Sequence, residues 1–412
     1  MKLLILPALL IILLLTLLSD YLFLKRLGVY FPARARKIFF WLCTFTHLYF
    51  IGYAAYLYCT PHHVVLPHLP TLVVIAFVLS KLLWLILWGL FIFPIAKLRP
   101  GSTQPFYAAT SLSVILCSYL LISGIVTRSH LKINRVEITS DRLPQSFDGY
   151  RIVHISDLHT GTFISSDTLF LATMVESIRS LRPDIVCFTG DIVNRESQEI
   201  VPYLPILQRL YDRQHPVYCV LGNHDYADYS RRLSPEQRAA DTDTLRHYLR
   251  SMNWILLDDT THIVHHRSFH QADNPFNPSD QLALMGVGNI GEPPFSSYGN
   301  LEKPLAMRNS TVSSDCFSIL LSHNPTHWRE EVLTDGTIDL TLSGHTHGMQ
   351  TSIFGFSPAA WIYDEWGGLY SENDRHLYVN VGVGAVGFPI RIGMRPEITL
   401  ITLRSKKEGL EP

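Results

Sequence analysis

The chain has 412 residues and a nearly balanced charge, with 34 Lys and Arg against 35 Asp and Glu. A net charge of −1 and the lack of a long basic run exclude the electrostatic footprint of a nucleic-acid-binding protein, so we expect no nucleic-acid partner. The six cysteines form no Cys-x-x-Cys pair, which argues against a zinc ribbon or a disulfide framework. The length allows one large domain with an appendage, or two domains. No protein partner can be inferred from the composition.

The first third of the chain is strongly apolar and predicts a transmembrane region over residues 1–128. Four segments reach the roughly 20 residues that a helix needs to cross a bilayer. They are residues 3–24, 38–58, 69–95 and 106–125. Lys2 precedes the first segment as in a signal peptide, but no small-residue cleavage site follows, so we interpret this segment as a membrane anchor.

Basic residues in the short loops predict the orientation of these segments. The first loop holds five Lys or Arg residues and the third holds two, whereas the second holds none. Because basic loops stay in the cytoplasm, we expect an integral protein of the plasma or inner membrane whose catalytic domain lies on the non-cytoplasmic side. Three basic residues just after the fourth segment, Arg128, Lys132 and Arg135, favour the opposite orientation.

Two charged residues interrupt the apolar segments. We expect Asp20, near the end of the first segment, to reach the membrane interface. We interpret Lys81, deeper in the third segment, as a side chain that snorkels along a tilted helix to the interface. The alternative is a Lys81 that is paired or functional within the membrane.

Residues 129–412 alternate strand and helix signals and predict a second, layered α/β domain. Apolar runs of strand length occur at 131–139, 151–155, 185–189, 217–221, 254–257, 319–322, 340–343, 377–383 and 397–403. Helical spacing occurs at 167–181, 203–213 and 241–252. Residues 267–300 are rich in Asn, Pro, Gly and Ser and predict a long loop, of a length often used for a lid.

Polar clusters follow five of the predicted strands, at the strand ends where α/β sheets collect ligands. The clusters are Asp157 with His159, Asp191, Asn223 with His224 and Asp225, His323, and His345 with His347. Carboxylates, an amide and imidazoles without a thiolate suit Mn²⁺, Fe or Zn²⁺. Without His224 and Asp225, the clusters hold seven candidate ligands, which are too many for one tetrahedral ion, so we expect two divalent ions, most readily Mn²⁺.

The ordered motifs Asp-x-His, Gly-Asp, Gly-Asn-His-Asp, His and Gly-His-x-His resemble the calcineurin-like metallophosphoesterase family over roughly residues 138–403. The opening strand and the C-terminal tail resemble its membrane-associated bacterial branch. The resemblance implies a layered β-sandwich flanked by helices and two ions that share Asp191. It assigns Asp157, His159 and His347 to the first ion and Asn223, His323 and His345 to the second. It further implies that His224 contacts the phosphate and protonates the leaving group, while Asp225 orients the His224 ring.

We therefore expect a membrane-anchored enzyme that cleaves a P–O bond with a hydroxide bridging two metal ions. The anchor favours a lipid-linked phosphodiester or pyrophosphate as substrate. A phosphodiesterase or phosphatase acting on soluble phosphoesters is the alternative among enzymes, and a metal-binding membrane sensor without turnover is the alternative from another class.

Three further polar residues have simpler interpretations. His154, on the opening strand, is expected to be a core histidine. The tail residues Arg391 and Arg395 are expected either to contact an anionic substrate or to pair with carboxylates.

Overall fold

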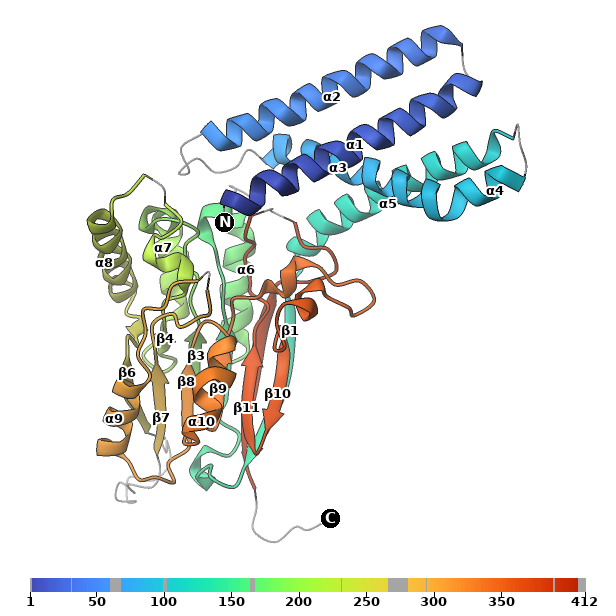
Figure 1. Ribbon diagram of the computed structural model, residues 1–412. Coiled ribbons are helices and arrows are strands. Elements are labelled where there is room, and N and C mark those ends of the chain that lie inside the picture. Colours follow the sequence, from blue (N-terminus) through green and yellow to red (C-terminus); the bar gives the residue numbers. More distant parts are fainter. Residues whose placement is uncertain are drawn as a thin grey trace. The chain divides into compact units, whose positions relative to one another are not determined.

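The structure is a computed structural model with two compact units, Met1–Ile125 and Val126–Pro412 (Figure 1). It describes residues 2–30, 32–59, 68–98, 102–163, 167–230, 232–265, 281–293, 295–387 and 390–406. Each unit has its own packing and is considered by itself.

The first unit is helical. It consists of α1 (Lys2–Tyr30), α2 (Ala33–Cys59), α3 (His68–Leu87), the π-helical segment η1 (Trp88–Ile92), α4 (Phe93–Leu98) and α5 (Gln104–Arg128). Among the described residues, three helical windows are long and apolar enough to cross a membrane: Ala33–Tyr56, Leu72–Leu90 and Gln104–Arg128. These three agree with the second, third and fourth predicted spans.

The first predicted span, residues 3–24, is not among these three windows. It lies in α1, which is helical throughout. The stretch of α1 whose side chains are described, 10–27, carries three charged residues, Asp20, Lys25 and Arg26. Charges at this density raise the cost of placing the stretch in hydrocarbon. The structure therefore supports three candidate spans rather than the four predicted.

The predictions that Asp20 reaches the membrane interface and that Lys81 snorkels to it are wrong, and the alternative of a paired Lys81 is confirmed. The Lys81 ammonium donates a hydrogen bond to Asp20 Oδ1, and Asp20 is only 4% exposed within the helical unit. His47 Nδ1 lies 3.4 Å from the second carboxylate oxygen. An isolated charge in an apolar interior is costly, so a cation and an anion brought together from α1 and α3 lower that cost mutually.

The second unit contains two six-stranded mixed sheets. The first has the order β1-β12-β2-β3-β4-β5 and the second β10-β11-β9-β8-β7-β6. The first comprises β1 (Lys132–Ser140), β12 (Glu397–Ser405), β2 (Arg151–Ile155), β3 (Ile185–Phe188), β4 (Val217–Cys219) and β5 (Ile255–Leu256). The second comprises β10 (Gly368–Glu372), β11 (Arg375–Val379), β9 (Leu340–Ser343), β8 (Ser318–Leu321), β7 (Gln281–Gly286) and β6 (Thr260–His265).

Apolar side chains from the two sheets meet in a shared core, which makes the unit a β-sandwich. Ile152 and Tyr218 of the first sheet and Ile319 and Leu342 of the second belong to this core. Successive residues of β2 face opposite sides of the sheet, so Val153 packs instead into the layer under the helices. This confirms the predicted α/β class.

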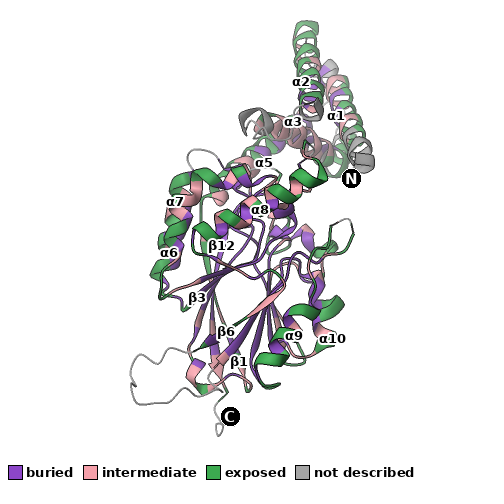
Figure 2. Ribbon diagram, turned by 90° about the vertical axis from the view of Figure 1, so that its left-hand side faces the viewer, coloured by how far each residue is buried: buried purple, intermediate pink, exposed green. Residues whose placement is uncertain are grey.

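Helices cover both outer faces of the sandwich (Figure 2). The first sheet is covered by α6 (Asp167–Ser180), α7 (Leu204–Leu207) and α8 (Pro235–Ser251), and α9 (Glu302–Thr311) and α10 (Leu333–Asp335) accompany the second. Helix α8 begins six residues before the predicted start at 241. Ser234 accepts a hydrogen bond from Gln237 N, and the Gln237 side chain accepts one from Ser234 N, a capping box that fixes the earlier start.

Two sequence-based expectations differ from the structure. Residues 281–286 of the predicted loop 267–300 form β7, whose apolar run Leu-Ala-Leu-Met is buried inside the second sheet. Residues 267–280 lie outside the described residues. The predicted helix 203–213 is a series of short 3₁₀ and α turns, from η4 (Ser197–Tyr203) to η5 (Gln208–Leu210), since Pro202 and Pro205 remove two backbone donors.

Strands β2, β3 and β4 are parallel to one another, as are β8 and β9 in the other sheet. The carboxyl ends of parallel neighbours lie at one edge of a sheet. All five predicted polar clusters follow one of these strands, so the topology brings them to one end of the sandwich.

Candidate metal centre

The seven predicted ligands meet in one site built by five loops. Asp157 and His159 follow β2, Asp191 follows β3 and Asn223 follows β4. The second sheet contributes His323 after β8, and His345 and His347 after β9. Six of these side chains are buried and His345 is partly buried, so their polar atoms face one another rather than solvent.

A first group consists of Asp157, His159 and His347, whose ligand atoms lie within 4.8 Å of one another. The Nε2 atoms of the two histidines are 2.9 Å apart. His347 Nε2 lies 3.2 Å from Asp157 Oδ1. Two imidazole nitrogens and a carboxylate oxygen thus present lone pairs to a shared point, as the ligands of a cation do.

A second group consists of Asp191, His323 and His345, with Asn223 beside them. Asn223 Oδ1 lies 3.1 Å from His323 Nε2 and 2.9 Å from His345 Nδ1. The His323 Nδ1–H donates to the carbonyl of Thr189 at 2.7 Å, which fixes the ring and leaves Nε2 directed at the group. The donor set again fits a divalent cation of borderline hardness.

Asp191 joins the two groups. Its Oδ2 atom lies 3.5 Å from His159 Nε2 and 3.3 Å from His323 Nε2. Its other oxygen, Oδ1, accepts a hydrogen bond from His224 N at 2.9 Å. One carboxylate therefore faces a nitrogen of each group.

The backbone at the site is held in an unusual conformation. Five of the seven predicted ligands have positive φ angles: Asp157 54°, His159 47°, Asp191 58°, His345 72° and His347 50°. Non-glycine residues adopt this left-handed region at an energetic cost and concentrate in it at functional sites. The surrounding strands thus stabilise a geometry that these residues would not adopt locally.

At Gly222 and Gly344 the backbone lies so close to side chains of the site that there is no room for a Cβ atom. A Cβ at Gly344 would lie 1.9 Å from Ser156 Oγ and 2.2 Å from Asp157 Oδ2, and one at Gly222 would lie 2.2 Å from Asp191 Oδ1. A side chain at either position would displace a carboxylate of the site. Gly190, which precedes Asp191, is needed for a different reason, because its φ of 93° lies in the left-handed region that glycine adopts at no steric cost.

Electrostatics hold the two carboxylates ionised. Burial opposes ionisation of Asp157, but the neighbouring His347 and His159 hold its pKa well below the usual range. Burial likewise opposes ionisation of Asp191, and His323 and His224 outweigh it and lower its pKa. Burial lowers the pKa of His345 to about 3, so its ring is neutral and offers a lone pair at neutral pH.

His224 lies at the partly exposed side of the site. Its Nδ1–H donates to the carbonyl of Asn194 at 2.6 Å, which leaves Nε2 free. The ring stacks on Tyr229, with centroids 4.1 Å apart, and meets His159 edge-on at 4.8 Å. Burial lowers the pKa of His224 to about 4, so the ring is neutral at pH 7. His224 also forms, with His159 and Asp191, a group of side chains whose ligand atoms lie within 4.8 Å of one another.

Asp225 has a different position from the one expected. The His224 ring is oriented by the Asn194 carbonyl and not by Asp225. The Asp225 carboxyl group instead accepts four backbone N–H bonds at 2.8–3.1 Å. The donors are Asp191, Ile192, Val193 and Gly222. Asp225 thereby fixes the turn that carries Asp191, and the ring of its neighbour is held by a backbone group that no sequence motif reveals.

Of the two alternatives for the tail arginines, pairing with carboxylates is wrong, whereas contact with an anionic substrate stays a prediction. Arg391 is fully buried, donates to the carbonyls of Val381, Gly382 and Gly384, and places Nη2 3.2 Å from His347 Nδ1. Arg395 donates to two carbonyls at 130 and 131. Neither guanidinium forms an ion pair with a carboxylate among the described residues. Both donate instead to backbone carbonyl oxygens, which accept hydrogen bonds from a guanidinium as carboxylate oxygens do. His154, in contrast, is buried and bonded to Thr189 Oγ1 as expected.

Three aromatic residues at the site were not predicted. The Asn223 amide donates to Tyr229 Oη at 2.8 Å, Tyr363 Oη lies 3.3 Å from His345 Nε2, and Phe295 meets the His345 ring edge-on at 4.5 Å. Only the Tyr229 position, six residues after Asn223, had a nearby sequence signal. Tyr363 and Phe295 come from loops whose path the sequence does not specify.

Comparison with known proteins agrees with this geometry. Residues 150–349 match the model of the calcineurin-like phosphoesterase domain. The chain is 30% identical over 278 residues to the uncharacterized metallophosphoesterase YkuE of Bacillus subtilis, a match that covers 65% of this chain and 84% of that protein.

Two further relatives carry informative names. One is the UDP-2,3-diacylglucosamine pyrophosphatase LpxG of Chlamydia trachomatis, 30% identical over 71% of this chain and 95% of that protein. The other is a transmembrane protein with metallophosphoesterase domain of Danio rerio, 28% identical over 72% of this chain and 63% of that protein. The matched domain, the sequence identities and the grouping of candidate metal ligands in one site lead to the same conclusion. This chain belongs to the calcineurin-like phosphoesterase family of metal-dependent phosphoester hydrolases.

Proposed function

We propose that the protein is a membrane-anchored phosphoesterase that uses two divalent metal ions. One ion is held by Asp157, His159 and His347, the other by Asn223, His323 and His345, and Asp191 binds both. The observation that carries this proposal is the position of Asp191 Oδ2, 3.5 Å from His159 Nε2 and 3.3 Å from His323 Nε2. Mn²⁺ is the first choice of metal, with Fe and Zn²⁺ as alternatives for a mixed N and O ligand set.

The ions supply positive charge to the phosphoryl oxygens and make a water molecule acidic near neutral pH. The chain's own contribution is position and proton transfer. Asn194 holds the Nδ1–H of His224, so Nε2 is the atom available to a phosphate or to its leaving oxygen. The negative charge of a bound phosphate raises the pKa of a nearby histidine, which allows His224 to carry the proton that the leaving oxygen takes.

A lipid-linked phosphodiester or pyrophosphate is the proposed substrate class. Among the described residues, three helices are apolar and long enough to span a membrane, which favours a substrate that is itself in the bilayer. LpxG, by its name, acts on a nucleotide-linked lipid pyrophosphate, and it matches this chain over 95% of its own length.

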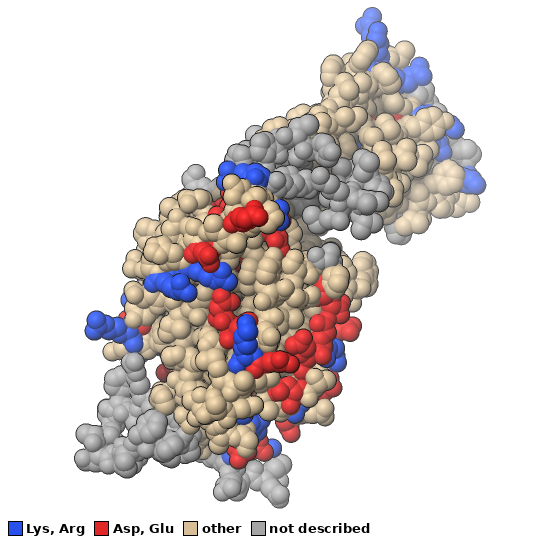
Figure 3. Space-filling view, turned by 60° about the vertical axis from the view of Figure 1, so that its left-hand side comes forward, with Lys and Arg blue, Asp and Glu red and all other residues tan. Residues whose placement is uncertain are grey.

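The catalytic domain is proposed to lie on the non-cytoplasmic side. Lys and Arg side chains gather at one end of the helical unit (Figure 3). Arg36 lies in the first turn of α2 and Lys97 in the last turn of α4. Such an end stays in the cytoplasm. Protease treatment of intact cells tests this, because a domain outside the cytoplasm is digested without permeabilisation and a cytoplasmic one survives.

Turnover is tested with purified full-length protein and bis(p-nitrophenyl) phosphate in the presence of Mn²⁺. We expect D191A to abolish hydrolysis and to bind fewer ions, because it removes the shared ligand. D141A, which removes an exposed carboxylate of the same domain, serves as the matched control and keeps full activity. Stoichiometric metal binding by the native chain without hydrolysis of any phosphoester would instead identify a sensor.

The substrate class needs its own experiment. The native enzyme is incubated with membrane lipid extract and, separately, with UDP-2,3-diacylglucosamine, and phosphorylated lipids are followed by mass spectrometry. Metal-dependent loss of one lipid-linked species that D191A does not consume supports the proposal. Hydrolysis confined to water-soluble phosphoesters contradicts the lipid assignment and leaves the two-metal site intact.

A further inference from the structure

A loop of the second unit, residues 349–363, exposes a group of large apolar side chains, and we call it the apolar loop. It follows the metal-centre residue His347 and contains no charged residue. Phe354 is fully exposed, and Trp361 and Ile362 are 77% and 66% exposed. The other exposed large apolar side chains of the loop are Met349, Ile353 and Phe356.

The tip of the apolar loop is a tight turn that favours residues other than phenylalanine. Ile353 and Phe356 exchange two backbone hydrogen bonds, at 2.9 and 3.0 Å, around Phe354 and Gly355. The φ angles of Phe354 and Gly355 are 53° and 84°. Two-residue turns with a positive φ at both positions are usually Asn-Gly or Asp-Gly. Phe354 therefore costs backbone strain and leaves its ring in solvent, and neither effect stabilises the fold.

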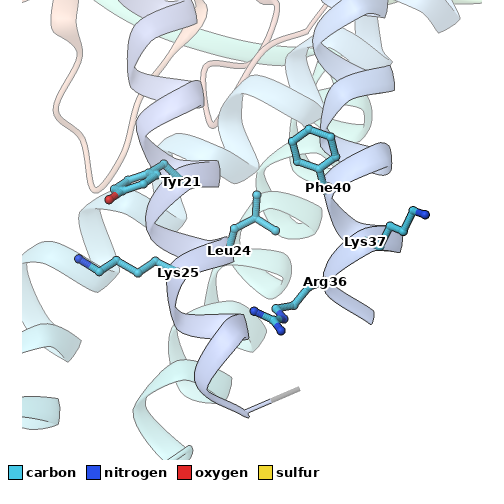
Figure 4. Close-up of a pocket in the computed structure, with 6 residues that line it drawn as sticks. All are labelled: Tyr21, Leu24, Lys25, Arg36, Lys37 and Phe40. Carbon is cyan, nitrogen blue, oxygen red and sulfur yellow. The ribbon is translucent and has the colours of Figure 1, made fainter. Parts of the chain in front are cut away.

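Exposed rings have a simple explanation in the helical unit. Phe40 of α2 (Figure 4) is 50% exposed and lies in the candidate span Ala33–Tyr56. Side chains of a span contact lipid, so an exposed ring is expected there. No candidate span lies among the described residues after Arg128, so the exposure of the apolar loop needs a separate explanation.

The chain enters the second unit directly from a candidate membrane span. This span is Gln104–Arg128, and β1 begins at Lys132. Four backbone steps of at most about 3.5 Å place Lys132 within about 14 Å of the end of the span. Arg395 fixes this connection, because it donates hydrogen bonds to the carbonyls of residues 130 and 131. The beginning of the second unit is therefore held near the membrane surface.

The apolar loop contacts the segment that carries Arg395. Ser352 N donates to the Ile392 carbonyl at 2.7 Å, and Ile392 N donates to the Gln350 carbonyl at 2.8 Å. Gly393 packs so closely that a Cβ there would lie 2.1 Å from the carbonyl oxygen of Ser352. The loop is thus connected, through residues 392–395, to the part of the chain that leaves the membrane.

The apolar loop also borders the metal centre. Near its C-terminal end, Tyr363 Oη lies 3.3 Å from His345 Nε2. In its middle, Ser357 Oγ donates to the Gly348 carbonyl at 2.6 Å and so ties the loop to the turn that carries His347. A partner that covers the loop therefore lies next to the metal centre.

We propose that the apolar loop inserts Phe354, Trp361 and Ile362 into the bilayer that anchors the chain. The membrane is favoured over a second protein because the span Gln104–Arg128 brings it to the connected end of the same unit. Exposed Trp, Phe and Ile side chains without nearby charge in the loop suit the boundary between headgroups and acyl chains. The insertion does not depend on the proposed reaction, but it gives the metal centre access to the headgroups of membrane lipids.

The test is photocrosslinking of the full-length protein in dioleoylphosphatidylcholine nanodiscs. The photoreactive residue p-benzoylphenylalanine replaces Phe354 or, as a control, Gln145, which is exposed and lies beyond the opposite end of β1. We expect mass spectrometry to find lipid attached at position 354 at least about tenfold more often than at position 145. Equal lipid attachment at both positions would overturn the proposal, as would attachment of position 354 to a second copy of the protein in place of lipid.

A pair of variants tests whether the ring at the tip drives the insertion. F354N removes the ring and introduces a residue that this turn favours, so the Tm is retained or raised. With p-benzoylphenylalanine at position 362, we expect F354N to lower lipid attachment about tenfold. M307N removes an exposed apolar side chain of α9 and is the matched control, with less than about a twofold change.

Equal lipid attachment in F354N and M307N would contradict insertion of the tip. Crosslinking needs no turnover, so its outcome is independent of the reaction at the metal centre. A protein whose apolar loop crosslinks to lipid but which hydrolyses no phosphoester would contradict the proposed function and support this inference.

Discussion

Adjacent residues in the Gly-Asn-His-Asp motif have different physical roles. His224 presents a free ring nitrogen to the metal centre, whereas Asp225 points away from it and accepts four backbone N–H bonds. Both residues belong to the same sequence motif, which does not show that their roles differ. Only the hydrogen bonds distinguish a side chain that acts on a ligand from one that fixes the loop carrying Asp191.

The pair H224N and D225N tests this distinction. D225N replaces an acceptor oxygen with an amide that cannot accept, so at least one backbone N–H loses its partner and the free energy of unfolding falls by about 3 kcal/mol. H224N leaves these bonds intact and loses only the ring contacts, so the Tm of the catalytic unit falls less than in D225N while kcat for bis(p-nitrophenyl) phosphate drops about 100-fold or more. Equal Tm values for the two variants would contradict the assigned roles.

Glu199, which lies next to the loop that holds the His224 ring, should make the stability of the protein depend on pH. Its carboxylate accepts the N–H groups of Asn194 and Arg195 at 2.6 and 3.1 Å, and Asn194 in turn holds the His224 ring. Burial raises the pKa of Glu199 from 4.5 to about 7. The folded protein therefore binds more protons than the unfolded chain between these pH values.

Stability should accordingly fall as the pH rises through this window. The contribution of Glu199 is fully present below pH 4.5 and lost above about pH 7, and it amounts to at most about 3 kcal/mol. E199Q cannot ionise, so its Tm between pH 5 and 8 should change less than that of the native chain. Parallel Tm profiles for the two proteins would refute this origin of the pH dependence.

At the scale of helices, the buried ion pair ties α1 to α3. Lys81 donates to Asp20, and Ser19 Oγ donates to the carbonyl of Lys81 at 3.1 Å. The pairing could not be read from the sequence, because Asp20 and Lys81 are 61 positions apart and a lysine of a long apolar helix can also extend to the interface.

A double-mutant cycle measures this contact. D20N or K81M alone leaves a buried charge without its partner and should lower the free energy of unfolding by about 3–5 kcal/mol. The double variant D20N/K81M leaves no buried charge, so it should lose clearly less than the sum of the single variants. K97M, at an exposed lysine, is the control and should have little effect on Tm in detergent. Additive losses would exclude direct coupling.

The strands and their loops differ in how well the sequence predicts them. Short buried runs that end in Gly-Asp or Gly-His identify β3 and β9, and they place the polar clusters at the same sheet edge. β7 was missed because its apolar run lies inside a segment rich in Asn, Pro and Gly. The pairing of strands, and contacts such as Tyr363 with His345, depend on chain paths that no local pattern specifies.

For the whole molecule, metal binding and folding of the catalytic unit should be linked. A ligand that binds only the folded state stabilises it by about 2.7 kcal/mol at a hundred times its dissociation constant. We expect EDTA to lower the Tm of the native protein and added Mn²⁺ to restore it. D191N should respond weakly to both. A Tm that is the same with and without chelator would contradict a metal centre that contributes to stability.

The pairing of β1 with β12 has a consequence for how the protein is made. These strands are parallel over nine residues, from Lys132 with Glu397 to Ser140 with Ser405, and β12 also separates β1 from β2. A ribosome releases β1 hundreds of residues before the partner that belongs between β1 and β2. The first sheet therefore cannot form its complete strand order until β12 has been synthesised and has paired with both β1 and β2.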